Sequence, residues 1–199
     1  MRKFLGVVVV LVIAFAAYWA WALYGAAQIA AVASQGDAAG VMQRVDLGAL
    51  RHSLSRQIVR AYLEQNPQFQ KMGGLEQGIV GSVGGGVADA MLREFLTPEN
   101  LAALLQKGQV GAVKEGDAAA LWRMPSLSAA FRDGALQAVS HSYFDGPLSF
   151  VVLLDGPDGR YGVHLHLSGT AWLLSGLDIP EALSARLAHE ISDRQKAAG

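Results

Sequence analysis

The chain has 199 residues, of which 52% are hydrophobic and 17% are charged, and its formal net charge at pH 7 is −1. This near-neutral balance excludes the strong basic excess of a general nucleic-acid binder. The chain contains no cysteine, which excludes disulfides and a cysteine-linked lipid anchor. An exported domain of this composition depends on its core alone for stability.

The first element is an apolar segment at the N-terminus. No charged residue occurs from Phe4 to Gly36, and Arg2 and Lys3 stand directly before it. Its first part, residues 4–23, has the roughly 20 apolar residues that a helix needs to cross a bilayer. The basic residues predict a cytoplasmic amino end and an exported remainder. An aromatic belt at the far end is formed by Tyr18, Trp19, Trp21 and Tyr24.

A cleaved signal peptide is the main alternative to an anchor here. A signal-peptide cleavage site has two small residues separated by one other residue. Ala14-Phe15-Ala16 and Ala20-Trp21-Ala22 both have this pattern. The apolar run is longer than a signal-peptide core, and it ends in the aromatic belt. These features favour an uncleaved anchor over a cleaved signal, and both over a buried helix of a soluble protein.

The next part of the chain carries helix boundary signals. Gly36-Asp37 predicts the end of the first helix and the N-cap of a second. Asn66-Pro67 predicts the end of a third helix, and Thr97-Pro98 predicts the start of another that stops at Gly108. The apolar stripe of the third helix is formed by Leu47, Leu50, Leu54 and Ile58.

The pattern becomes β-rich after Arg132. Apolar runs at 135–144, 148–154, 161–167 and 171–179 are separated by Asp-Gly-Pro and Ser-Gly turns, which predicts a four-stranded antiparallel meander. Pro180 then opens a last amphipathic helix. Helices followed by a sheet indicate an α+β fold. We expect an anchor at 1–24, a helical region at 25–132 and a sheet with the final helix at 133–199, the last two forming one domain.

The motifs that usually carry chemistry are weak. The glycine-rich segment 73–86 lacks the lysine of a phosphate-binding loop and suits close helix packing or a connector. His164 and His166 share one face of a predicted strand, and His141 is the only further histidine expected near them. A polar sheet face explains them better than a zinc site, which needs more ligands. We therefore predict no metal, no cofactor and no catalytic residue.

Two sets of residues are candidates for binding. Five aromatic side chains are expected between the helices and the sheet, either as core or as the lining of a ligand pocket: Trp122, Phe131, Phe144, Phe150 and Trp172. Four arginines lie away from the leucine stripe of the third helix and are expected on a solvated face or at lipid head groups: Arg44, Arg51, Arg56 and Arg60.

Several segments together resemble a known family. These are AAYWAWALYG, AAQIAAVASQGDAAGVMQRVDLGALRHSL, LTPENLAALL and the late strand AWLLSGLDIP. The chain resembles the bacterial envelope proteins of domain-of-unknown-function family 2939. This sequence departs from the pattern of that family at Ala22-Leu23, where a proline is more usual. The resemblance implies an exported domain on a single anchor, and it implies no activity. The order of helices followed by an antiparallel meander also resembles that of cystatin-like or nuclear-transport-factor-like rolls, a likeness at the level of fold only.

The sequence thus favours a non-enzymatic protein of the bacterial inner membrane with a periplasmic domain that binds an envelope protein or a lipid. A carrier or sensor of a small apolar ligand, held between helices and sheet, is the first alternative. An enzyme of unrecognised type, built around the three histidines, is the second.

Overall fold

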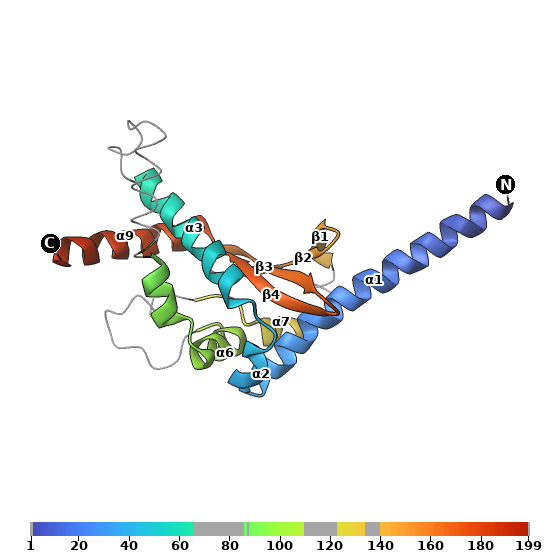
Figure 1. Cartoon of the computed structure of the whole chain (residues 1–199), viewed down its shortest axis with the longest axis horizontal. Helices are drawn as coiled ribbons and strands as arrows, with labels where there is room; N and C mark the ends of the chain where they lie inside the picture. Colours follow the sequence, from blue (N-terminus) through green and yellow to red (C-terminus); the bar gives the residue numbers. More distant parts are fainter. Residues whose placement is uncertain (1, 66–85, 87, 110–122, 134–139, 199) are drawn as a thin grey trace.

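The computed structural model describes residues 2–65, 86, 88–109, 123–133 and 140–198, which form an α+β fold (Figure 1). The helices before the sheet are α1 (Arg2–Ser34), α2 (Ala38–Met42), α3 (Leu47–Gln65), α6 (Pro98–Lys107) and α7 (Leu127–Asp133). The strands are β1 (Ser142–Gly146), β2 (Ser149–Gly156), β3 (Gly159–Ser168) and β4 (Ala171–Asp178), and α9 (Glu181–Ala198) follows them. The predicted class and order of elements are confirmed.

The long first helix ends where the sequence predicts. α1 runs for 33 residues, and Gly36 just beyond it has φ of 70°, the left-handed conformation that glycine adopts without strain. The side chain of Asp37 accepts a hydrogen bond from the backbone N–H of Gly40 at 2.9 Å and caps α2. This tight break turns the chain back against α1.

Other predicted features of the helices also agree with the structure. Leu50, Leu54 and Ile58 are buried along α3, and the stop expected at Asn66-Pro67 lies outside the described residues. The hydroxyl of Thr97 accepts from the N–H of Asn100 at 3.2 Å, and α6 stops at Gly108 with φ of 73°. These signals set the helix ends through contacts within a few residues along the chain.

The four strands form an antiparallel sheet in the order β1-β2-β3-β4. Tyr161, Val163 and Leu165 are buried on one face, as the alternation in this segment predicts, and His164 and His166 lie on the other. In such a meander the β1–β2 and β3–β4 turns lie at one end of the sheet, and the β2–β3 turn lies at the other end.

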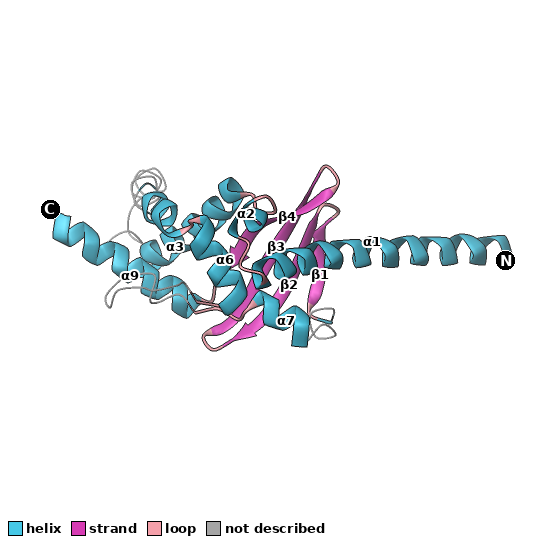
Figure 2. Ribbon diagram, turned by 90° about the horizontal axis from the view of Figure 1, so that it is seen from below, coloured by secondary structure: helices cyan, strands magenta, loops and turns pink. Residues whose placement is uncertain are grey.

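One apolar core joins the helices to this sheet. Figure 2 shows α1, α6 and α7 over one face of the sheet, and leucines of α3 join the same core. The hydroxyl of the buried Tyr161 donates to the carbonyl of Arg123 at 2.6 Å. Burial, and then the Asp158 carboxylate, raise the pKa of Tyr161, while Arg186 opposes them.

Some predictions fall on residues outside the described ranges. They are the glycine-rich segment 73–86, except for its last residue, and Trp122.

Candidate functional site

The two halves of α1 have different surroundings. The side chains of residues 4–17 are exposed, whereas the second half of the helix is buried in the core through Ala22, Ala26, Ile29 and Ala33. Phe4–Ser34 is long and apolar enough to cross a membrane, with a mean hydropathy of 2.4. One continuous helix therefore passes from an exposed apolar segment into the core of the folded domain (Figure 1).

An aromatic cluster forms where α1 meets the sheet. It comprises Phe15, Tyr18 and Trp21 of α1 with Phe144, Phe150 and Trp172 of the sheet. The rings of Tyr18 and Phe144 stack at 5.1 Å, and those of Trp21 and Trp172 meet edge-on at 6.1 Å. Such pairs stabilise packing by about 0.5–1.5 kcal/mol each beyond the burial of their area.

Hydrogen bonds fix the end of the sheet to the same part of α1. The hydroxyl of Tyr18 donates to the carbonyl of Pro147 in the β1–β2 turn. The indole N–H of Trp19 donates to the hydroxyl of Ser142 on β1 at 3.3 Å. The β1–β2 turn is thereby held at the level of Tyr18 along the helix.

Gly25 allows α1 to approach β4 closely. A Cβ atom added at this glycine would lie 2.6 Å from the Cβ of Trp172, closer than side chains approach in folded proteins. Trp172 is 4% exposed, and its indole nitrogen has no hydrogen-bond partner in the described structure. The close approach at Gly25 is not among the predictions from sequence. A glycine within an otherwise alanine-rich helical run often marks such a contact, and this was the available clue.

A crevice of about 310 Å³ opens beside this contact, between α1 and β4. Its lining includes Tyr24 and Gln28 of α1, Arg44 from the α2–α3 connection, and Thr170 of the β3–β4 turn. Backbone hydrogen bonds from Leu174 to Arg44 at 2.9 Å, and from Asp46 to Leu174 at 2.8 Å, fix that connection along the edge of β4. Arg44 is therefore placed close to α1.

The other three predicted arginines lie elsewhere. Arg51, Arg56 and Arg60 line a groove of about 740 Å³ along α3, together with His52 and Asp89. Glu64 also lines the groove, and Asp89 pairs with Arg93 at 2.7 Å, so the three arginines outnumber the carboxylates among the described lining residues. In both views α3 lies on the opposite side of the molecule from the N-terminal end of α1 (Figures 1 and 2). This position favours contact with the aqueous phase.

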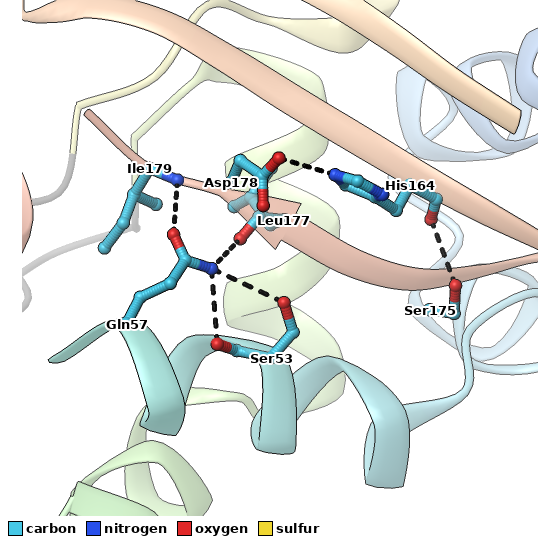
Figure 3. Close-up of polar contacts among 7 residues, drawn as sticks. All are labelled: Ser53, Gln57, His164, Ser175, Leu177, Asp178 and Ile179. Carbon is cyan, nitrogen blue, oxygen red and sulfur yellow. Dashed lines mark hydrogen bonds and ion pairs between the residues drawn. The ribbon is translucent and has the colours of Figure 1, made fainter. Parts of the chain in front are cut away.

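A polar network connects α3 to the end of β4 (Figure 3). The side-chain amide of Gln57 donates to the carbonyl of Leu177 at 2.7 Å and accepts from the N–H of Ile179 at 2.9 Å. His164 contacts the Asp178 carboxylate at 2.6 Å. The network positions α3 against the sheet, and within the described residues no group of three histidine or acidic side chains is arranged to hold a metal ion.

Some of the five aromatic residues predicted between the helices and the sheet lie together in the structure. Phe144, Phe150 and Trp172 join the aromatic cluster, while Phe131 of α7 is half-buried against the core. Between α3, α6 and the sheet, the lining leucines and Val163 leave a space of only about 10 Å³. That space is too small for a ligand larger than one water molecule. In this layer the described side chains act as core.

Comparison with known families identifies part of the chain. A family model described as a protein of unknown function, DUF2939, matches residues 11–104. Over this part, just under half of the chain, the predicted resemblance to DUF2939 is supported. The matched region contains the exposed and buried parts of α1 from residue 11, the capped break at Gly36-Asp37, and the groove-forming α3. It ends within α6, so the late strand at 171–178 lies outside the match. No curated protein and no solved structure matched the chain.

Substitution of Gly25 tests the close contact between α1 and β4. Gly25→Ala should lower the free energy of unfolding by about 1–3 kcal/mol, because the added methyl group collides with Trp172 near its backbone. Thermal unfolding in detergent, followed by near-ultraviolet circular dichroism, measures the change.

Gly6→Ala is the matched control, since a Cβ at Gly6 would meet no atom within 4 Å. It should leave the unfolding temperature unchanged or raise it slightly, as alanine favours helix. Equal effects of the two substitutions would contradict the assignment of Gly25.

Proposed function

We propose that this chain is a single-pass protein of the bacterial inner membrane whose periplasmic domain binds a protein partner of the cell envelope. The observation that supports the anchor is the exposed apolar half of α1, which no described element covers. Arg2 and Lys3 precede this half and favour a cytoplasmic amino end.

The packing of α1 favours retention over cleavage. A cut after Ala22 would remove Tyr18 and Trp21, whose rings pack on Phe144 and Trp172. It would also divide a helix that is continuous to Ser34. A cut after Ala16 would remove Phe15, whose ring contacts Phe144, and the apolar run continues beyond this site to Leu23, longer than a signal-peptide core. We therefore propose that the segment stays attached as the anchor.

The α3 groove is the surface that best supports binding. Three arginines line it, and two of them, Arg56 and Arg60, are four residues apart and so adjacent on one face of the helix. The helix that carries the groove, α3, lies away from the N-terminal end of α1 (Figure 1), which supports access by a partner outside the membrane. We propose that it receives an acidic segment of that partner, because guanidinium groups bind carboxylates in bidentate fashion. The filled core beneath α3 offers no support for the apolar-ligand carrier.

Reporter fusions test the topology. Alkaline phosphatase fused after Gly199 should be active, because that enzyme requires export, and membranes should yield the fusion with its N-terminal segment intact by mass. A fluorescent protein that requires the cytoplasm should stay dark at the same position. The reverse pattern, or a soluble product cut after Ala16 or Ala22, would contradict the proposal.

Crosslinking and affinity purification from solubilised membranes test the groove. The double variant Arg56→Glu/Arg60→Glu should lose its partner by at least tenfold, while Arg160→Glu, an exposed charge reversal on β3, should keep it. The same partner recovered by both variants, or lipid in place of any protein, would contradict the groove as the binding surface.

A further inference from the structure

The exposed part of α1 is shorter than a membrane span. The Phe15 ring already contacts Phe144 of the sheet, and from Phe4 to Tyr18, whose hydroxyl bonds the β1–β2 turn, the helix rises only about 21 Å. The hydrocarbon core of a bilayer is about 30 Å thick, and tilting the helix would cover even less of it. If α1 crosses a bilayer, the domain does not stand clear of it, and the level of Tyr18 falls inside the boundary of the lipid.

The end of the sheet lies at this same level. The Tyr18 hydroxyl bonds the carbonyl of Pro147 in the β1–β2 turn, so that turn enters the boundary with the helix. Apolar side chains on this turn and on β1 are exposed: Leu148 of the turn is 48% exposed and Tyr143 of β1 is 45% exposed. Bulky apolar groups exposed on a turn lose contact with water when lipid surrounds them.

Residues one to three helical turns beyond Tyr18 lie at the distance from Phe4 at which the lipid headgroups are expected. Tyr24 and Gln28 lie about 30 and 36 Å from Phe4. They line the α1–β4 crevice with Arg44, which can approach lipid phosphates there. Tyr24 is 62% exposed, as expected of a belt residue. The exposed carboxylate of Asp145 on the β1–β2 turn limits how deeply that turn sinks.

We infer that the end of the sheet bearing the β1–β2 and β3–β4 turns is embedded in the lipid interface of the bilayer that α1 crosses. Leu148 and Tyr143 insert among the lipids, and Arg44 lies at the level of the phosphates. The inference rests on the proposed anchor. It implies that the domain has a fixed orientation on the membrane, with the α3 groove turned toward the aqueous side.

Because the chain has no cysteine, single cysteines with nitroxide labels can report depth directly. The full chain is placed in vesicles of phosphatidylethanolamine and phosphatidylglycerol. Labels at Leu148→Cys and Tyr143→Cys should be accessible to oxygen, which dissolves in lipid, and protected several-fold from a water-soluble nickel reagent. Pro147→Cys and Pro157→Cys form a matched pair, since each proline follows Asp-Gly in a turn, at opposite ends of the sheet. Only Pro147→Cys should be protected.

A label at Val10→Cys tests the membrane anchor separately from the embedded end of the sheet, because Val10 lies in the exposed half of α1. A water-accessible label at Val10 would overturn the anchor itself. A lipid-accessible label at Val10 with nickel-accessible labels at Leu148 and Tyr143 would overturn only the embedded sheet end. Labels at Leu148 and Tyr143 that neither reagent reaches would also overturn it, because they would report burial against protein, such as a second copy.

Discussion

The close contact between α1 and β4 at Gly25 and Trp172 determines the rest of the structure. Without a Cβ at Gly25, the indole-bearing strand packs directly on the helix, and the aromatic cluster assembles around it. The contact makes one helix serve both as a core element and as the support of an exposed apolar segment that is long enough to cross a membrane. That segment is joined to the domain by continuous helix, without a flexible linker.

The remaining elements complete this arrangement at increasing distance from the anchor. The β1–β2 turn is fixed to Tyr18, the α2–α3 connection is fixed along β4, and Gln57 holds α3 to the far end of β4. Each link transmits the position of α1 to the next element. The helix that carries the arginine groove, α3, consequently lies at the side of the molecule away from the N-terminal end of α1.

The sequence predicted the elements that depend on local chemistry. The Asp37 and Thr97 caps, the glycines that end α1 and α6, and the alternation along β3 all act within a few residues. It did not show that the second half of α1 joins the core, because a run of alanines suits lipid and protein equally well. Nor did it pair Gly25 with Trp172 or separate Arg44 from the α3 arginines, since these depend on contacts between distant segments.

Removal of defined parts of α1 measures the central claim, that the helix is divided between membrane and domain. A chain without residues 2–16 should fold in aqueous buffer and unfold cooperatively, with the near-ultraviolet signal of packed tryptophans, because the buried half of α1 is intact. A chain without residues 2–34 should show neither property, since the core loses Ala22, Ala26, Ile29 and Ala33. Equal folding of the two truncated chains would contradict the account, because α1 would then be an anchor alone.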